Sequence, residues 1–469
     1  MKDREVGPAG RSPAAGGGRE GRLSQGLKWL YGSANLGFGL LQATVGFYLM
    51  YFYTDIAKID PATAGTAMLI SKFTWDAVVD PRFGWLSDRT RSRWGRRRPY
   101  LIFGALPLGL AAWLLFSIPA RLSGLKAFLI VAGTYLLFDT IRSSVIMPYN
   151  ALSAELTTDY GERTGLIAIQ QITSVSGYII GASVILALVG LFRGPLGGEH
   201  AAWSRTAMVL GAVVAAAVWT TAFGVRIKPA VNSAPARMPA RSAYLQAFRN
   251  KPFMIYMAVN MLAAFVLVVT QGMIPYYVIY QLGMKSSLSI IMLVFLVTVV
   301  AFVYPYKILA DRLNKGPAWA IGLALSGLAL FLTFLLPHHP TFWIYPLMVL
   351  SGMGFAAEFV FPGSMIPDMI ELDELVTGER HEGIYYGLRS FLDKLTAALG
   401  SAVMGWTLAG FGYVGGAAQT PRAVFGIRLL FCVVPAILLW ACLPFLVRFP
   451  VTRKTHQALI EKLRIKQGL

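Results

Sequence analysis

Long apolar stretches recur along almost the entire chain, and they restrict the fold more than any other feature. Each has the length of about 20 residues that a helix needs to cross a bilayer. Only 14% of the residues are charged, against roughly 25% in soluble globular proteins, so most of the surface is expected to face lipid. The stretches lie at about 28–54, 61–86, 99–119, 125–155, 164–192, 203–226, 253–281, 286–310, 316–336, 341–370, 383–410 and 423–447. We therefore predict an all-α membrane protein with twelve transmembrane helices.

The distribution of positive charge predicts how these helices are oriented. The formal net charge is +19, and the lysines and arginines gather in alternate connections and at the two termini. The richest clusters lie in the N-terminal arm, in Arg89–Arg98, between Arg226 and Lys251, and in the tail from Arg448. This is the positive-inside pattern, and it disfavours nucleic acid as the partner. We predict a multi-pass protein of the bacterial inner (plasma) membrane with both termini cytoplasmic.

A polar, basic segment near the middle divides the chain into two sets of six apolar stretches. The first residues are rich in Gly, Pro, Ala and Arg and have no apolar core, so a secretory signal peptide is not expected. The predicted organisation is a disordered basic cytoplasmic arm, an N-terminal six-helix bundle, a cytoplasmic linker, a C-terminal six-helix bundle and a basic cytoplasmic tail. Their predicted bounds are 1–27, 28–226, 227–252, 253–448 and 449–469.

Two pairs of charged motifs suggest that the halves repeat each other in parallel. Gly84–Arg89, after the second stretch, is matched by Ala310–Lys315 after the eighth. Glu155–Thr164, after the fourth, is matched by Glu371–Arg380 after the tenth. Two parallel six-helix halves with a solute site between them are the architecture of major facilitator transporters, and this is the fold we predict.

These motifs also predict a cytoplasmic gate. Acids and arginines at neighbouring helix ends can join by charge-assisted hydrogen bonds, which would close the cytoplasmic side and break when it opens. The alternative is that the arginines only fix the topology, which we favour for Arg96, Arg97 and Arg98. The candidate gate residues are Asp88, Arg89, Glu155, Asp159, Glu162, Arg163, Asp311, Arg312, Glu379 and Arg380.

Two acids in the second apolar stretch predict a cation site. A charge at the bilayer centre costs at least ~2.5–3.5 kcal/mol on insertion scales, so it needs a partner or a function. Asp76 and Asp80 are four residues apart and share one helix face. Adjacent carboxylates repel unless they share a proton or a cation, which favours Na⁺ or H⁺. In the alternative, Lys72 and arginines of other helices neutralise them.

The remaining intramembrane charges allow two pairs. Asp139 and Arg142 are three residues apart, and Arg389 and Asp393 are four apart, so each pair can meet on one helix face. Such pairs are either structural or part of a solute site. Lys394 has only Asp393 as a local partner, so it is the candidate for a charge that responds to cation binding.

Features of an enzyme are missing from the sequence. The five histidines fall in predicted loops or the tail without metal-ligand spacing, and the phosphate-binding motif of ATP-driven transporters does not occur. The two cysteines, Cys432 and Cys442, share one apolar stretch and imply no disulfide framework. We predict no enzymatic activity and no cofactor other than a transported or coupling cation.

Three segments near the N-terminus resemble a known family. Tyr48–Asp55, Trp75–Gly84 and Thr90–Pro99 are similar to segments of the glycoside–pentoside–hexuronide:cation symporters of the major facilitator superfamily. The resemblance runs from about Tyr31 to about Arg448. The sodium-dependent lysophosphatidylcholine symporter of vertebrates resembles the chain in the same two acids of the second stretch, so the fold does not restrict the substrate to sugars.

The resemblance implies roles for four residues. Asp76 and Asp80 match the family's cation-binding aspartates, Ser143 stands where the family has a hydroxyl ligand, and Lys394 matches the lysine that couples the cation and substrate sites. Other family positions have changed. The sugar-binding acids fall on Gly39 and Ile146, an arginine falls on Gln170, and an asparagine cation ligand falls on Val79.

The predicted function is therefore a Na⁺- or H⁺-coupled symporter of a glycoside or other sugar derivative. The alternatives are a symporter of a lysolipid-like amphiphile and, less favoured, a membrane receptor or scaffold that transports nothing. The partners would be a small-molecule substrate, a monovalent cation and membrane lipid, and the protein would be a monomer. The candidate cavity residues are Asn35, Gln42, Asp139, Arg142, Tyr149, Asn150, Gln170, Tyr386 and Arg389.

Overall fold

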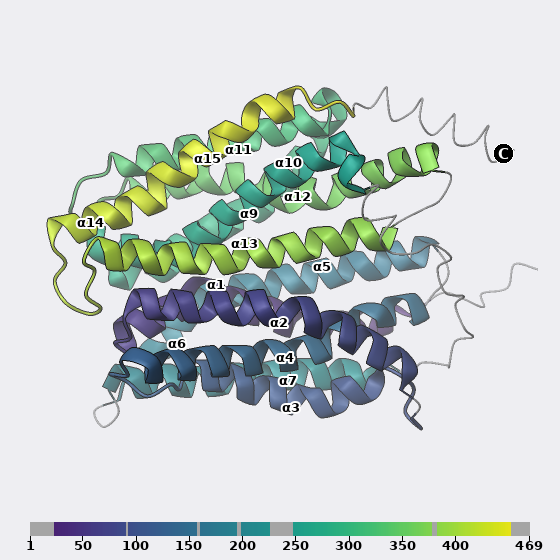
Figure 1. Ribbon diagram of the computed structural model, residues 1–469, viewed down its shortest axis with the longest axis horizontal. Helices are drawn as coiled ribbons and strands as arrows, with labels where there is room; N and C mark the ends of the chain where they lie inside the picture. The colour runs from purple at the N-terminus through teal and green to yellow at the C-terminus, as the bar shows by residue number, and fades with distance from the viewer. Residues whose placement is uncertain are drawn as a thin grey trace, which may run out of the picture.

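The computed structural model of the protein is a bundle of long helices in two side-by-side halves (Figure 1). It describes residues 23–90, 92–156, 160–194, 198–225, 247–377 and 382–451. The first half contains α1 (Gln25–Tyr51), the π-helical turn η1 (Phe52–Ile56), α2 (Pro61–Arg89), α3 (Arg98–Leu115), α4 (Gly124–Leu156), α5 (Tyr160–Ser183), α6 (Ile185–Leu191) and α7 (Gly198–Gly224).

The second half has the same plan. It contains α9 (Lys251–Tyr276), the π-helical turn η2 (Tyr277–Gln281), the short η3 (Lys285–Ser287), α10 (Leu288–Leu313), α11 (Lys315–Phe334), α12 (Ile344–Thr377), α13 (Glu382–Gly410), α14 (Pro421–Arg428), the π-helical turn η4 (Leu429–Val433) and α15 (Val434–Val447). Because α5 and α6 form one span, and α14, η4 and α15 form another, the described residues of each half contain six spans.

Each of the twelve predicted apolar stretches coincides with one of these spans, so the predicted fold class is confirmed. In the described part of the chain, ten helices are long and apolar enough to cross a membrane. The other two spans are α2 and α13. Each is long enough to cross a membrane, with 29 residues, but together they contain most of the intramembrane charges. They pack against each other where the halves meet. These two helices are therefore shielded from lipid on their facing sides.

Several helices begin where the sequence supplies a cap. An Asn, Asp, Ser or Thr side chain accepts a backbone N–H of the first turn and satisfies a donor that the helix leaves free. In three of these helices a proline follows at one of the first two positions, where its missing N–H costs nothing. The capping residues are Ser24, Asp60, Asn250 and Thr420.

Close packing of α1 against α5 depends on glycine. A Cβ atom on Gly39 would lie 2.0 Å from the backbone oxygen of Ser174, and one on Gly177 would lie 2.0 Å from the backbone oxygen of Leu36. The two backbones therefore touch directly along this seam. Since α1 lines the centre of the molecule, the seam fixes the position of the cavity wall.

The bundle has two ends, which we name the Asp55 end and the linker end. The Asp55 end contains η1, η2 and the connection from α13 to α14, while the linker end contains Leu23, Val225, Ala247 and Val451. The halves meet in the part of the bundle toward the Asp55 end, where the indole of Trp406 in α13 donates to Thr66 of α2 at 2.9 Å. In Figure 1, α2 and α13 run together toward that end and diverge toward the linker end.

Candidate cation and solute site in the central cavity

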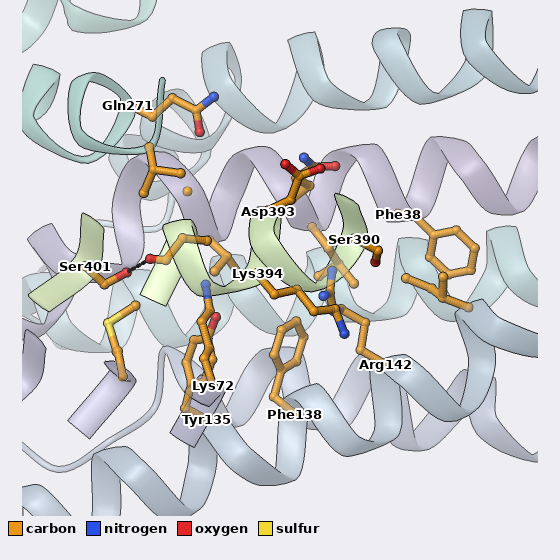
Figure 2. Close-up of a pocket in the computed structure, with 18 of the residues that line it drawn as sticks. Phe38, Lys72, Tyr135, Phe138, Arg142, Gln271, Ser390, Asp393, Lys394 and Ser401 are labelled. Atoms are coloured by element: carbon orange, nitrogen blue, oxygen red, sulfur yellow. Dashed lines mark hydrogen bonds between the residues drawn. The ribbon is translucent and has the colours of Figure 1, made fainter. Parts of the chain in front are cut away.

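A cavity of about 480 Å³ lies between the two halves (Figure 2). It begins beside Met50, in the last turn of α1, and reaches Tyr386 near the start of α13. Tyr386 is 44% exposed, so the cavity approaches the surface toward the linker end. Its walls come from α1, α2, α4, α9 and α13. The polar and aromatic lining residues are Phe38, Gln42, Lys72, Tyr135, Phe138, Arg142, Gln271, Tyr386, Arg389, Ser390, Asp393, Lys394 and Ser401.

The wall formed by α2 and α4 is basic and aromatic. The ammonium of Lys72 lies 5.3 Å from the centre of the Tyr135 ring, within the range of a cation–π interaction. Arg142 pairs with Asp139, with 3.2 Å between Nε and Oδ1. The second oxygen of Asp139 is buried, and no described residue hydrogen-bonds to it. This oxygen is therefore an acceptor directly behind the cavity wall.

The opposite wall is formed by α13 and supported by α9. Arg389 pairs with Asp393, with 3.3 Å between Nε and Oδ2. The buried Asn260 of α9 donates to the other oxygen of Asp393 at 2.7 Å. Both ion pairs that the sequence spacing allowed are thus formed. Lys394 lines the cavity immediately after Asp393.

The described residues do not test the predicted cation site. The backbone of α2 is helical through Asp76 and Asp80, but the side chains of both residues lie outside the described part of the structure. Lys72 and Met68, about one and two turns before Asp76 in α2, line the cavity. Ser143 in α4 is buried, with 3% of its surface exposed. The cation site thus remains a proposal.

The predicted cavity residues divide into two groups. Gln42, Arg142, Tyr386 and Arg389 line the cavity, and Asp139 pairs with one of them. The others lie apart from the described lining. Asn35 donates to the backbone oxygen of Gln170 at 3.2 Å, Tyr149 stacks on Tyr31 at 4.7 Å between ring centres, and Asn150 is exposed. Asn35 and Tyr149 therefore have packing roles in this conformation.

Gln271 is a cavity residue that the sequence reasoning missed. It comes from α9 and donates a short hydrogen bond to the hydroxyl of Tyr178 in α5, which joins the two halves beside the cavity. The available signal was an amide within a strongly apolar stretch, where an unsatisfied polar group is costly. Phe38, Tyr135 and Phe138 were also missed, because aromatic residues are common throughout apolar helices.

The predicted gate at the linker end is only partly described. Glu162 pairs with Lys28 at 2.9 Å, which joins α5 to α1 inside the first half. Lys315, which was not predicted, pairs with Asp368 at 2.7 Å inside the second half. Arg89, Asp311 and Arg312 are exposed at the ends of α2 and α10. The side chains of the other candidates lie outside the described residues; these are Asp88, Glu155, Asp159, Arg163, Glu379 and Arg380.

Comparison with known proteins identifies the family. The model of the family described as MFS/sugar transport protein matches residues 30–453, which is most of the chain. The chain belongs to this family. It is similar to the putative glycoside/cation symporter YagG of Escherichia coli K12, with 28% identity over 93% of this chain and 95% of that protein.

Two more distant similarities concern a relative with a lipid substrate and a solved structure with the same fold. The sodium-dependent lysophosphatidylcholine symporter 1-A of Danio rerio is 22% identical, over 88% of this chain and 83% of that protein. A bacterial homologue of the human lysosomal transporter Spinster, solved in an inward-facing and unoccupied conformation, superimposes with a TM-score of 0.68 at 12% identity. That match covers 93% of this chain and 97% of the other, and it supports the major facilitator fold. The protein is thus a multi-pass membrane transporter of a cation-coupled symporter family and not an enzyme.

The family positions that have changed now have a structural context. Ile146 lines the cavity, so an apolar side chain stands where the resemblance places a sugar-binding acid. Gly39 is different, because its missing side chain would point at α5 and not into the cavity. Gln170 offers its backbone oxygen to Asn35. Of these three changed positions, Ile146 is the one in the described lining of the cavity.

Proposed function

We propose that this protein is a symporter that moves a glycoside or other sugar derivative together with Na⁺ or H⁺ by alternating access. It would act in the bacterial inner membrane with both termini cytoplasmic. The observation that carries the proposal is the central cavity between two six-helix halves, closed toward the Asp55 end and lined by polar, aromatic and charged side chains. With the predicted topology, this conformation faces the cytoplasm.

The cavity suits a compact polar solute. Its volume of about 480 Å³ falls in the ordinary range of small-molecule sites, roughly 300–1,000 Å³. The aromatic rings of Phe38, Tyr135 and Phe138 can pack on the apolar faces of a sugar ring. Gln42 and Gln271 can each both donate and accept hydrogen bonds. Each sugar hydroxyl gives up hydrogen bonds to water on binding, so it needs partners that can both donate and accept hydrogen bonds.

One feature of the cavity favours the lysolipid-like alternative. The part of the cavity nearest the Asp55 end is lined by Val45, Met50, Met68, Val268 and Met404. Flexible methionine side chains adapt to apolar ligands of varied shape. An amphiphile could place a short apolar segment here and its polar group near Arg142 and Arg389. A glycoside with an apolar aglycone could bind in the same way, with the aglycone among these apolar side chains and the sugar near Arg142 and Arg389.

Cation coupling is proposed for Asp76, Asp80 and Ser143, with Lys394 as the coupling charge. Lys394 and Lys72 both line the cavity, Lys72 from the helix that contains the two acids. Without a bound cation, we expect Lys394 to lean toward these acids and neutralise them. A cation would displace it, and the change would strengthen solute binding by a coupling free energy of typically 1–3 kcal/mol.

Uptake of labelled solutes into proteoliposomes tests this function. A panel of labelled glycosides and lysophosphatidylcholine is offered with and without Na⁺, and with and without a pH gradient. We expect a glycoside to accumulate only with a cation gradient. Asp76→Asn and Asp80→Asn should abolish accumulation while exchange at high substrate persists. Accumulation by both variants would place the cation site elsewhere, and cation-dependent transport of lysophosphatidylcholine alone would favour the second candidate.

Lys394→Ala separates coupling from stability. We expect the variant to fold and to bind solute with an affinity that no longer depends on the cation, as measured by isothermal titration calorimetry with and without Na⁺. Lys307→Ala is the matched control, because Lys307 is an exposed intramembrane lysine of α10 that does not line the cavity. A destabilised Lys394 variant that keeps its cation dependence would mean that Lys394 is only structural.

A further inference from the structure

Asp55 is a buried acid at the junction of the two halves. It lies in η1, which continues the first helix of the first half, and only 4% of its surface is exposed. Among the described residues no lysine or arginine pairs with its carboxylate. A buried charge is costly unless hydrogen bonds compensate for lost water, so the compensation must come from neutral donors.

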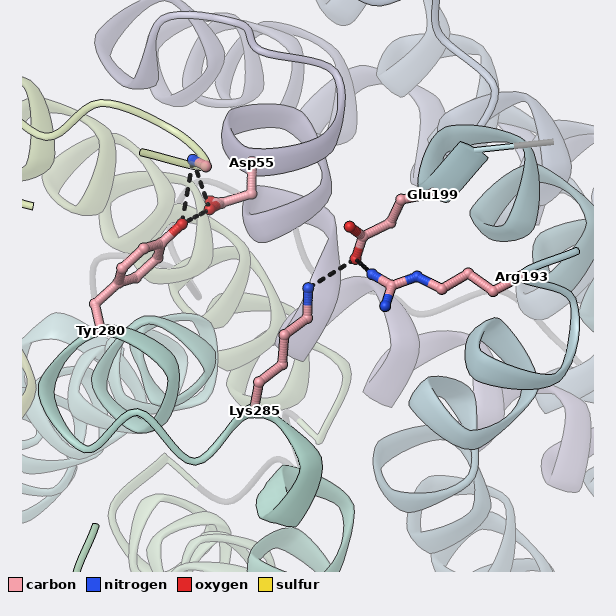
Figure 3. A network of polar contacts seen from close by, with 6 residues as sticks. Asp55, Arg193, Glu199, Tyr280 and Lys285 are labelled. Atoms are coloured by element: carbon pink, nitrogen blue, oxygen red, sulfur yellow. Dashed lines mark hydrogen bonds and ion pairs between the residues drawn. The ribbon is translucent and has the colours of Figure 1, made fainter. Parts of the chain in front are cut away.

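Three of these donors belong to the second half, and Figure 3 shows the contact made by one of them, Tyr280. The hydroxyl of Tyr280 in η2 donates a short hydrogen bond to Oδ1, and the backbone N–H of Gly416 donates to the same oxygen at 3.2 Å. The hydroxyl of Tyr413 donates to Oδ2 at 2.6 Å. Thr54, the neighbour of Asp55, supplies a fourth donor at 2.7 Å. Three of the four donors to the carboxylate therefore come from the opposite half.

The loop that carries two of these donors fits closely onto η1. The backbone oxygen of Gly415 accepts a hydrogen bond from the ammonium of Lys58 at 2.8 Å. A Cβ atom on Gly415 would lie 1.9 Å from the backbone oxygen of Thr54, and one on Gly416 would lie 1.8 Å from the Lys58 ammonium. Gly416 also has a φ of 67°, which disfavours other residues. The loop can thus reach Asp55 because Gly415 has no side chain to meet the η1 backbone and because Gly416 adopts a positive φ.

A second link between the halves at this end is more exposed. Glu199 of the first half lies 2.8 Å from Lys285 of the second and 2.6 Å from Arg193 of its own half. The side chains are 31%, 45% and 48% exposed, in that order. Water and salt screen such pairs, and exposed pairs contribute little. The buried Asp55 contacts are the stronger link.

We propose that Asp55 is the gating residue for the Asp55 end of the transporter. Its contacts with Tyr280, Tyr413 and Gly416 hold this end closed, and they break whenever the cavity opens to that side. We call these three contacts the latch. When they break, water can hydrate the donors and the acid, so the latch can form and break without any bound ion. The inference rests on the alternating access proposed above, but it concerns a conformational equilibrium and needs no knowledge of the solute.

Distances between spin labels test the latch in the full-length protein in nanodiscs. With both native cysteines replaced by serine, cysteines at Ala120 and Phe342 carry labels on exposed connections at the Asp55 end, one in each half. Ser92 and Leu313 carry a second pair at the linker end. Unaltered Asp55 should give mainly the short distance at the Asp55 end. Asp55→Asn and Tyr413→Phe should increase the longer-distance population roughly tenfold or more, since hydrogen bonds to a charge are lost.

Two further variants control for other effects. Gly415→Ala keeps the acid and its donors but places a Cβ 1.9 Å from the Thr54 backbone oxygen, so it forces the loop away and should open the same end. Glu199→Gln removes the exposed link and should change the populations far less. Unchanged distances in Asp55→Asn and Gly415→Ala together would overturn the proposal, as would an equal shift in Glu199→Gln. A shift confined to the latch variants supports it even if no glycoside is transported, so the two proposals fail separately.

Discussion

Replacing Gly39 by alanine tests the claim that this position packs helices and does not face the solute. The added Cβ would meet the Ser174 backbone oxygen at 2.0 Å. Real Cβ contacts are essentially never shorter than 3.0 Å, so α1 and α5 must separate by about 1 Å at this point. Backbone atoms cannot rotate away, as the end of a side chain could. The strain therefore spreads along the seam.

The cost follows from the contacts that the separation weakens. A gap of 0.5–1 Å loses a quarter to a half of each contact of ~0.1–0.2 kcal/mol. For about 30 atom pairs along the seam, the loss is roughly 1–3 kcal/mol, the usual cost of overpacking. Unfolding entropy scales with chain length, so the melting temperature should fall by roughly 1–3 °C.

Thermal unfolding in nanodiscs measures this effect with two controls. Gly177→Ala adds a Cβ from the other side of the seam, 2.0 Å from the Leu36 backbone oxygen, and should destabilise equally. Gly133 in α4 is exposed and has nothing within 4 Å of an added Cβ. Its replacement by alanine should stabilise slightly, because glycine within a helix is unfavourable. A Gly39 variant as stable as the Gly133 variant would refute the reasoning.

Three other predictions concern the cavity and the orientation of the chain. Asn260→Ala removes the 2.7 Å hydrogen bond to Asp393. The side chain of Asp393 is 38% exposed, so water can replace part of the lost hydrogen bonding. Chemical unfolding should therefore show that the free energy of unfolding falls by only about 1 kcal/mol. Tyr135→Phe should preserve solute affinity and Tyr135→Ala should weaken it about threefold to tenfold, since phenylalanine keeps a ring for Lys72; equal titration curves for both variants would contradict this. A cysteine at Phe342, exposed at the Asp55 end, should react with an impermeant maleimide added to intact cells, and reaction only after permeabilisation would reverse the predicted topology.

The sequence predicted features that depend on one helix at a time. The Asp139–Arg142 and Arg389–Asp393 pairs follow from spacing within a helix, and the apolar stretches follow from the thickness of a bilayer. Details of the span ends were less predictable. The stretch at 164–192 is interrupted at Val184 between α5 and α6, and α12 continues past its apolar part to Thr377, because helical backbone bonds do not require an apolar sequence.

Contacts between distant segments could not be predicted in this way. Asp55 was named from the sequence only as the last residue of Tyr48–Asp55, a segment that resembles the family. Its partner Tyr413 follows it by 358 positions, and no periodicity links the two. The same holds for Lys72, whose contact with Tyr135 requires α2 to pack on α4. A single chain supplies no covariation, so such pairs appear only when the helices are assembled.

The contact between Asp55 and Tyr280 has a consequence for symmetry. Asp55 is the fourth residue of η1 and Tyr280 is the fourth residue of η2, and each turn continues the first helix of its half. Equivalent positions of the two halves therefore meet near the pseudo-twofold axis that relates them. If both halves descend from one duplicated unit, identical residues once faced each other here. Two aspartates would repel and two tyrosines would share one weak hydrogen bond, so a strong contact required the copies to diverge. The charge could have remained on either copy, and exchanging the two residues would move it to the other side of the axis.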